Sequence, residues 1–408
     1  MPKETEFKFE DIRFVEENSA VRGFFLGYYY FDLSEEDLER LGKWKVKDKA
    51  LIISGNEDMV KKKFNAMLDR KLHELKSLQG KDTIYVYEGF LPLIGSLYFG
   101  IMDRNTNVVE VRPLTGCNLN CIFCSVDLNQ RQKDFVVNAD YLADEFSKVA
   151  EQKFMAGVEV EAHINAQGEP LMYQKLPYLI QKITDSGYAS VISIDTNGTL
   201  LTQKLVDELV EAGLTRFNIS LNSLCSEMGT KIAGKTYPSD HVIKMCKYIA
   251  KKADILIAPV WMQGMNDHEI EDMIKFSLEL KKIRPQQTVP MIGIQNFLEY
   301  EYGKQPAKQI SFEDFYKKLE PFEKKYKMKL VFDKDDFNIK KCITLKKPFR
   351  KNQHVECEIA CDGKFPGEKL AFAGDRVISL PNCDAKIGKK VKVTLTREKY
   401  NVFYGAVN

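Results

Sequence analysis

The sequence has no hydrophobic run approaching the about 20 residues that a membrane-spanning helix requires. The uncharged stretch 91–102 contains Pro92 and Gly95, which suits a buried strand or loop. The first residues, MPKETEFKFEDIRF, are charged and lack the apolar centre of an export signal. These absences predict a cytoplasmic protein with no membrane association.

Histidine is scarce, with 5 in 408 residues, and no cysteine precedes Cys117. Neither a Ser-His-Asp arrangement nor a Walker-type phosphate loop is present. His163 falls in a strand-like run, where a hydrogen-bonded core histidine is favoured over one facing a barrel interior. Three of the 9 cysteines, however, fall within eight residues. In a reducing compartment, such a cluster favours metal ligation over disulfides.

Charge is unevenly distributed along the chain. Residues 340–408 hold 15 Lys+Arg against 7 Asp+Glu, whereas residues 1–339 hold 45 against 51. A basic tail on an acidic body indicates an anionic partner, but a solvated lysine-rich surface explains the charge equally well.

Three regions differ in their pattern. Residues 1–104 mix aromatic clusters with helical stretches such as 58–78, and predict an accessory α+β domain. Residues 105–340 alternate amphipathic helices with strand-like runs at 108–112, 158–164, 190–195, 216–222, 255–262 and 288–295. Residues 341–408 contain short alternating runs split by turn signals, which predict a small β-barrel.

The alternation in the central region predicts βαβ units and a parallel sheet. Because such crossovers are right-handed, the sheet can curl into a full or partial TIM-like (β/α) barrel. The expected fold class is therefore α/β, a partial barrel carrying an N-terminal α+β domain and a C-terminal β-barrel. Functional side chains are expected on the loops at the carboxyl ends of the barrel strands.

The stretch RPLTGCNLNCIFCSVD follows the first strand of this array and spaces Cys117, Cys121 and Cys124 as C-x3-C-x2-C. Three thiolates are one ligand fewer than a closed site needs, so a bound metal group keeps an open position. The alternatives are a zinc site or three unrelated buried cysteines. The tight spacing in a loop after a strand favours an iron–sulfur cluster.

This cysteine motif resembles that of the radical S-adenosylmethionine (SAM) superfamily, and the resemblance covers about residues 105–335. It implies a [4Fe-4S] cluster on the three cysteines and SAM on the unligated iron. It also implies that SAM is cleaved to a 5′-deoxyadenosyl radical, with electrons from a donor such as ferredoxin or flavodoxin.

Further motifs resemble those of the superfamily and imply SAM contacts. Phe123 stands at the family's aromatic position before the last cysteine. Gln167, Gly168 and Glu169 begin a QGEP sequence that is similar to the family's Gly-Gly-Glu-Pro element, with Gln167 replacing the first glycine.

Two later strand ends add to the implied SAM contacts. Asp195 and Asn197 belong to a DTNGT turn, which resembles the family's Thr-Asn-Gly turn. Ser220 and Asn222 alternate with apolar residues in NISLNSL, so their side chains and that of Asn218 should share one strand face.

The C-terminal region resembles a TRAM domain, a small β-barrel found on RNA-modifying enzymes, in its PGEKLAF segment and its basic ending. The resemblance implies RNA, and tRNA in particular, as a partner. Lys347, Arg350, Lys389 and Lys390 are the expected phosphate contacts. Aromatic residues such as Phe349 and Phe365 either stack on bases or fill the barrel core.

The remaining cysteines leave a second cluster open. Cys342, Cys357, Cys361 and Cys383 lack a tight C-x2-C pair. Cys357 and Cys361 lie four apart in a strand-like run, hence on one face, and this favours core packing.

The sequence therefore predicts a radical SAM enzyme that modifies RNA at an unreactive carbon. Methylthiolation is disfavoured, because residues 1–116 contain no cysteine for the second cluster of TRAM-bearing methylthiotransferases. Two alternatives stay open: a peptide or small-metabolite substrate, and a non-catalytic RNA-binding protein with a structural metal.

Overall fold

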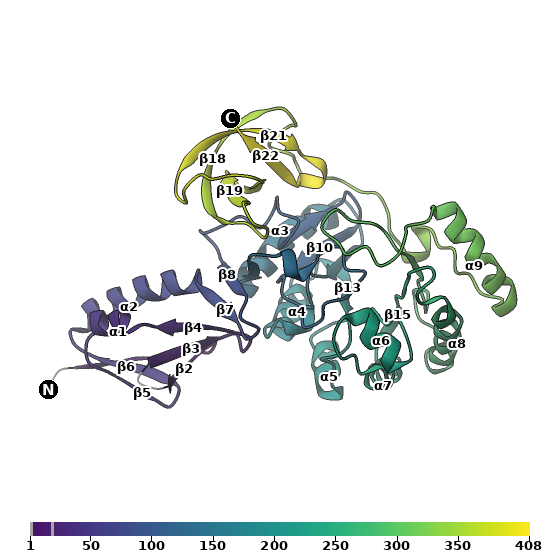
Figure 1. The fold of residues 1–408 in the computed structure, drawn as a ribbon, viewed down its shortest axis with the longest axis horizontal. Coiled ribbons are helices and arrows are strands. Elements are labelled where there is room, and N and C mark those ends of the chain that lie inside the picture. Colours follow the sequence, from purple (N-terminus) through teal and green to yellow (C-terminus); the bar gives the residue numbers. More distant parts are fainter. Residues whose placement is uncertain (1–2, 18–19) are drawn as a thin grey trace.

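A six-stranded sheet forms the centre of the chain, as seen in a computed structural model that describes residues 3–17 and 20–408 (Figure 1). Its order is β9-β10-β12-β13-β14-β15, and only β9 is antiparallel to its neighbour. The bounds are Gly100–Asp103, Val108–Arg112, Val160–Ile164, Ala189–Thr196, Arg216–Ile219 and Asp254–Ile257. Because consecutive parallel strands are neighbours, each βα unit extends the sheet by one strand, as in a (β/α) barrel.

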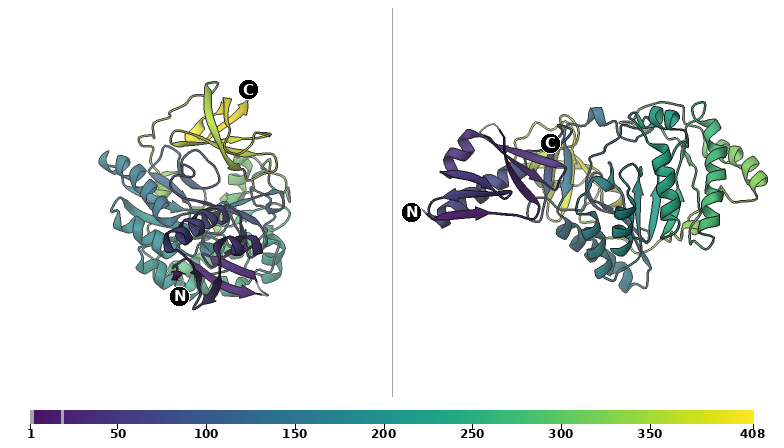
Figure 2. Two further views of the ribbon diagram at one scale, coloured as in Figure 1. Left: turned by 90° about the vertical axis from the view of Figure 1, so that its left-hand side faces the viewer. Right: turned by 90° about the horizontal axis from the view of Figure 1, so that it is seen from below.

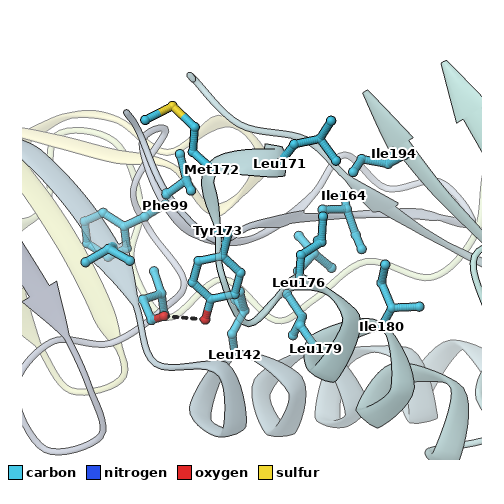
Figure 3. Close-up of a cluster of buried hydrophobic side chains, with 14 of the residues drawn as sticks. Phe99, Leu142, Ile164, Leu171, Met172, Tyr173, Leu176, Leu179, Ile180 and Ile194 are labelled. Atoms are coloured by element: carbon cyan, nitrogen blue, oxygen red, sulfur yellow. Dashed lines mark hydrogen bonds between the residues drawn. The ribbon is translucent and has the colours of Figure 1, made fainter. Parts of the chain in front are cut away.

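Helices between these strands cover the outside of the sheet (Figures 1 and 2). They are α3 Ala139–Met155, α4 Leu176–Asp185, α5 Gln203–Glu211, α6 Ser226–Ala233, α7 Ser239–Ile249 and α8 Asp267–Ile283. Figure 3 shows Leu176, Leu179 and Ile180 of α4 packed near Ile164 and Ile194 of the sheet. The helical spacing of these residues thus identified the buried face, and the α/β fold class is confirmed.

The far edge of the sheet is less regular than the sequence predicts. Only β16 Val260–Trp261 and β17 Gln295–Asn296 are strands there, and the strand expected over 288–295 is reduced to β17 and a single parallel bridge from Ile292 to Ile257 of β15. The Gln287 side chain bonds both the N–H (3.2 Å) and the C=O (3.1 Å) of Ile255. A side chain thus occupies the edge of β15 at Ile255, and Pro290 lacks an N–H. The following backbone pairs with β15 only at Ile257, which bonds Met291 O (2.9 Å) and Gly293 N (2.8 Å). Helix α9 Phe312–Tyr326 follows beyond this edge.

The N-terminal region contains two sheets. One has the order β1-β6-β5, with bounds Glu4–Phe7, Ala50–Ser54 and Trp44–Lys47. The other has the order β11-β8-β7-β4-β3-β2, with bounds Asp134–Val137, Asp82–Val86, Leu75–Ser77, Tyr29–Leu33, Ala20–Phe25 and Ile12–Glu17. Helices α1 Glu35–Leu41 and α2 Glu57–Leu72 complete the region. The helix expected over 58–78 therefore ends at Leu72, and β7 follows it.

The N-terminal sheets are continuous with the core. Strand β11 comes from the core loop after the cysteines, yet it pairs in parallel with β8. The expected division at 104/105 falls between β9 and β10, which are hydrogen-bonded neighbours. The accessory region is thus joined to the core by two sets of strand pairings.

The last five strands form a closed barrel in the order β18-β19-β20-β22-β21. Their bounds, in that order, are His354–Asp362, Lys369–Ala373, Arg376–Leu380, Phe403–Val407 and Lys390–Arg397. Cys357 and Cys383 are buried in its core, and Cys361 is buried in the larger hydrophobic cluster that it shares with the rest of the chain. The predicted small β-barrel is confirmed, and these cysteines pack as core residues.

The barrel docks on residues that lead into β9. Val377 N donates to Ile94 O (2.9 Å), and Phe403 N donates to Gly95 O (3.1 Å). A Cβ at Gly95 would lie 2.2 Å from Val377 O, so this contact requires glycine. No helix in the part of the chain that the structure describes is long and apolar enough to cross a membrane.

Candidate active site

The three motif cysteines lie in the loop between β10 and β11, and all are half-buried free thiols. Burial raises the pKa of the Cys117 thiol to about 12. Burial, together with the charges of Cys117 and Cys124, raises the pKa of Cys121 still further. Without a cation the thiols would stay protonated, and bound iron would convert them to thiolates.

The cysteine loop is held by segments from elsewhere in the barrel. Asn120 N donates to Ala233 O (3.0 Å), and Ile122 N donates to Ile232 O (2.9 Å) at the end of α6. The ammonium of Lys304 binds the side-chain oxygen of Asn120 at 2.7 Å. These contacts fix the loop backbone before any metal group binds.

The donor set fits a cluster better than a single ion. Among residues 3–17 and 20–408, no three His, Cys, Asp or Glu side chains converge on one ion position. In a cubane each of three thiolates binds a different iron, so their sulfurs need not converge. Cys117, Cys121 and Cys124 would therefore hold a [4Fe-4S] cluster and leave one iron open to SAM.

The QGEP segment lies directly against the cysteine loop. Glu169 N donates to Gly116 O at 2.8 Å, one residue before Cys117. A Cβ at Gly168 would lie only 2.0 Å from that same oxygen. The second glycine of the motif is therefore required by this backbone contact, whereas Gln167 has room for its side chain.

The carboxylate of Glu169 is fully buried and accepts three hydrogen bonds. Thr196 Oγ1 (2.6 Å) and Leu171 N (3.0 Å) donate to its Oε1, and Asn197 N (2.8 Å) donates to its Oε2. Burial raises the pKa of this carboxyl to about 7. Glu169 thus links its own turn to the DTNGT turn. Oε2 accepts one hydrogen bond and Oε1 accepts two, so Oε2 is the oxygen with more room for a further donor.

Asn197 connects the DTNGT turn to the cysteine loop. Its Nδ2 donates to Asn118 Oδ1 (2.9 Å), and Asn118 Nδ2 donates to Thr199 Oγ1 (2.8 Å). Three motifs far apart in sequence therefore meet at the carboxyl ends of β10, β12 and β13. Polar groups at this edge are suitably placed to bind a polar cofactor.

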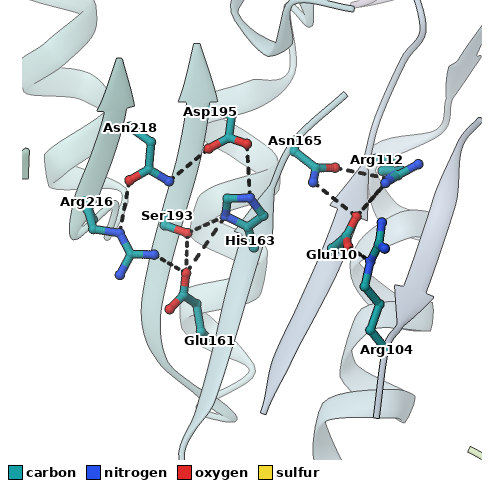
Figure 4. Close-up of polar contacts among 10 residues, drawn as sticks. All are labelled: Arg104, Glu110, Arg112, Glu161, His163, Asn165, Ser193, Asp195, Arg216 and Asn218. Atoms are coloured by element: carbon teal, nitrogen blue, oxygen red, sulfur yellow. Dashed lines mark hydrogen bonds and ion pairs between the residues drawn. The ribbon is translucent and has the colours of Figure 1, made fainter. Parts of the chain in front are cut away.

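A polar network fills the interior of the sheet below these loops (Figure 4). Asp195 accepts from Asn218 Nδ2 (2.8 Å) and lies 3.1 Å from His163 Nε2. Burial lowers the pKa of the His163 imidazole, but the charge and hydrogen bond of Asp195, together with the charges of Glu161 and Glu110, raise the pKa overall. His163 is thus a hydrogen-bonded member of the barrel interior.

The His163–Asp195 pair predicts a specific pH dependence of stability. A folded-state pKa above the unfolded value of about 6.5 makes the pair most stabilising at low pH. Its contribution is lost as the pH rises through the folded-state pKa. Between about pH 5.5 and about pH 8.5, we expect the unfolding free energy of His163→Gln to fall less than that of wild type.

Urea denaturation of the apoprotein at each pH measures this difference. His354 lies on the surface, with no ionic partner among the described residues. The unfolding free energy of His354→Gln should therefore change with pH as that of wild type does. Equal slopes for wild type and His163→Gln would contradict the ion pair.

The predicted strand face of NISLNSL is corrected by the structure. Strand β14 ends at Ile219, because Leu221 N turns back to Ile219 O (2.8 Å). Ser220 and Asn222 lie in the following loop, and Asn222 Oδ1 accepts from Val260 N (2.8 Å). Asn222 therefore joins the loop after β14 to β16 through its side-chain oxygen.

Phe123 lies in a small apolar cluster with Ile232 and Phe297. This cluster places an apolar wall beside the cysteine loop, contributed by α6 and the segment after β17. Such a surface suits the flat ring of an adenine.

The expected phosphate contacts Lys347, Arg350, Lys389 and Lys390 are all exposed on the C-terminal barrel. Lys347 pairs with Glu398 (3.3 Å), and Lys390 stands opposite Glu358 in the β18–β21 register. The two aromatic residues considered for stacking on RNA bases pack against other aromatic residues of the protein. Phe349 packs on Phe403, and Phe365 stacks on Tyr302 at 4.4 Å.

Sequence reasoning missed several residues of this region. Arg131 and Asp134 form a buried ion pair (2.9 Å), and Thr115 Oγ1 donates to Asp134 at 2.8 Å. Lys364 of the C-terminal barrel reaches Gln167 Oε1. The only sequence signal for Lys364 was its place in a DGKFPG turn, which predicts a turn but not its contacts.

Comparison with known proteins places this site in a family. Residues 111–277 match the Radical SAM superfamily. An uncharacterized protein of Methanocaldococcus jannaschii, MJ0103, is 36% identical over 81% of this chain and 82% of its own length. A GTP 3′,8-cyclase of Desulforamulus reducens is 28% identical over 44% of this chain and 54% of that enzyme. The structure of TYW1 with a lysine-pyruvate adduct aligns with a TM-score of 0.40 at 19% identity, covering 60% of this chain and 81% of TYW1.

The chain belongs to the radical SAM superfamily. It is accordingly a radical SAM enzyme, whose cofactors are a [4Fe-4S] cluster and SAM and which needs an electron donor. The alternative of a non-catalytic metalloprotein is set aside.

Proposed function

We propose that this enzyme modifies RNA, tRNA foremost, at an unreactive carbon, with its C-terminal barrel as a TRAM-like binding module. Cys117, Cys121 and Cys124 would hold the cluster, and Gly168, Glu169 and Asn197 would position SAM beside it. When bound and reduced, the cluster supplies the electron that cleaves SAM to a 5′-deoxyadenosyl radical.

The observation that carries the RNA substrate is a pair of exposed lysines on the C-terminal barrel. Lys386 and Lys389 lie in the exposed turn before β21 and form no ion pair with any described residue. Lysines that form no ion pair can contact phosphate groups without first breaking one. The region from residue 340 onward carries a net +8 against −6 for the rest, so this charge is concentrated on one module.

An aromatic cavity at the open edge of the sheet suits a base as the reacting group. It measures about 350 Å³, and its lining includes Leu256, Phe312, Tyr316 and Phe332. Leu256 pairs in register with Asn218, so the cavity adjoins the polar interior of the barrel. Aromatic walls beside polar groups suit a planar heterocycle that carries hydrogen-bonding edges.

A free purine nucleotide is the second candidate substrate. It is favoured by the similarity to the GTP 3′,8-cyclase of Desulforamulus reducens, although that similarity spans only 54% of that enzyme. The aromatic cavity would suit a nucleotide as well as a base in RNA.

The deciding experiment compares substrates for SAM cleavage. The protein is reconstituted with iron and sulfide under anaerobic conditions, reduced with dithionite and given SAM. 5′-Deoxyadenosine is then quantified with bulk tRNA, with purine nucleoside triphosphates, and with neither. Stimulation by tRNA supports the proposal, and stimulation by nucleotides alone supports the second candidate. Cleavage that neither increases overturns both, in favour of a peptide or another metabolite.

Charge reversal of the basic turn should weaken RNA binding. For Lys386→Glu/Lys389→Glu we expect tRNA affinity to fall by more than about tenfold. The plot of the logarithm of the binding constant against the logarithm of the salt concentration should become shallower, as expected for the loss of about two phosphate contacts. Fluorescence anisotropy across a salt series measures both. The control Lys281→Glu/Lys282→Glu reverses two exposed lysines on α8. Equal losses in both double variants would contradict a binding site on the C-terminal barrel.

A further inference from the structure

The connection between β18 and β19 inserts a buried lysine beside the cysteine loop. Lys364 is 0% exposed, and its ammonium donates to Gln167 Oε1 in the QGEP segment. Its carbonyl accepts from Gln132 N at 2.7 Å, just beyond the cysteines. Next to it, Phe365 stacks on Tyr302, whose carbonyl accepts from Asp127 N (2.7 Å). The C-terminal barrel therefore forms part of the wall of the cluster site.

The Lys364 ammonium has no carboxylate partner within ion-pair distance among the described residues. Asp134 is paired with Arg131. Glu368 accepts from Tyr98 OH (2.8 Å) and from the Lys364 backbone N–H (2.9 Å), within its own turn. A buried ammonium without an anionic partner is costly, and besides Gln167 its contact is the Tyr98 ring, whose centroid lies 5.2 Å from Nζ. A neighbouring negative charge would therefore stabilise the protonated form of Lys364.

The surrounding groups indicate where that charge lies. Burial and the neighbouring charge of Arg131 lower the pKa of Lys364 to about 7, whereas Asp134 and the Cys124 sulfur act in the opposite direction. Gln167, which Lys364 bonds, directly precedes Gly168, and Gly168 packs against Gly116 beside Cys117. The Lys364 ammonium therefore lies next to the segment that contacts the cysteine loop. Three thiolates give a [4Fe-4S] unit a net negative charge, and reduction adds one more electron from the donor.

We propose that Lys364, delivered by the C-terminal barrel, is the counter-charge that stabilises the reduced cluster on Cys117, Cys121 and Cys124. A fixed cation favours the state with more negative charge, so it makes reduction of the cluster easier. Lys364 is thus a positioning residue that acts through the cluster, and Gln167 holds its ammonium in place. The inference rests on the proposed cluster ligands.

The test measures the reduction potential of the cluster by EPR-monitored redox titration without SAM. For Lys364→Met we expect reduction to become at least about tenfold less favourable, which is about 59 mV for a one-electron couple. Lys364→Arg keeps the charge and should stay close to wild type. Lys399→Met removes an exposed lysine of the same barrel and should leave the potential unchanged.

Two further measurements separate the possible failures. Iron content and the thermal unfolding temperature show whether Lys364→Met is misfolded. If it is, Lys364→Gln takes its place, because its amide still donates a hydrogen bond to Gln167. If wild type binds no cluster on its three cysteines, the proposed site fails. If wild type cleaves SAM but the neutral Lys364 variants keep its potential, only the counter-charge inference is overturned. An unchanged potential with weaker SAM binding assigns Lys364 to the SAM carboxylate instead.

Discussion

Replacing Cys121 by alanine should reduce 5′-deoxyadenosine formation to background. Cys121 is the middle ligand of C-x3-C-x2-C, and the thiols of Cys117 and Cys124 cannot hold a cubane that needs three. Because loss of an outer-shell partner already costs about 10–100-fold, we expect loss of a ligand to exceed about 100-fold. Bound iron and sulfide per chain, together with product quantified after dithionite reduction, measure the effect.

The matched control for this substitution is Cys225→Ala. Cys225 is exposed, and its side chain makes no capping bond at the start of α6. We expect this variant to bind iron and cleave SAM at the wild-type level. A Cys121→Ala protein that retains iron and full cleavage would refute the assignment of the three cysteines.

Replacing Gly168 by alanine should disrupt the site as severely as the loss of a ligand, but through the backbone. The new Cβ would lie 2.0 Å from Gly116 O and 2.7 Å from its carbonyl carbon. Neither atom belongs to a flexible side chain, so the QGEP segment and the cysteine loop must separate. We expect the unfolding free energy of the apoprotein to fall by about 1–3 kcal/mol, with most of the bound cluster lost.

Gly116→Ala tests the same contact from its other side. There a Cβ would meet only Asp134 Oδ2, at 3.9 Å, which is ordinary contact. We expect Gly116→Ala to keep both stability and iron in urea denaturation and iron analysis. If Gly168→Ala behaved in the same way, the close approach of the two segments would not be required.

The limits of the sequence predictions have local causes. The run 288–295 looks like a strand because it is apolar, but the Gln287 side chain bonds β15 at Ile255, and the run pairs with β15 only at Ile257. The alternation in NISLNSL continues past Ile219, but the backbone turns there and Asn222 bonds β16 instead. Periodicity describes which faces can be buried, and it carries no information on which edge is still available for pairing.

The site shows the same division between local and non-local information. The cysteine spacing, QGEP and DTNGT are each contained in a few residues, so they could be recognised without a structure. The bonds from Thr196 and Asn197 to Glu169 cross 27 and 28 residues, and the bond from Lys364 to Gln167 crosses 197. No short motif encodes contacts of that range.

The sequence by itself determined the α/β class, the terminal β-barrel and the radical SAM family, because hydrophobic period and short ligand spacings are local properties of the chain. Only the tertiary structure decided what the strand ends bring together. The fit of Gly168 on Gly116, the burial of Glu169 and the insertion of Lys364 depend on backbone paths that approach one another through packing. Such contacts follow from the arrangement of whole helices and strands, and the neighbouring residues in the sequence do not specify that arrangement.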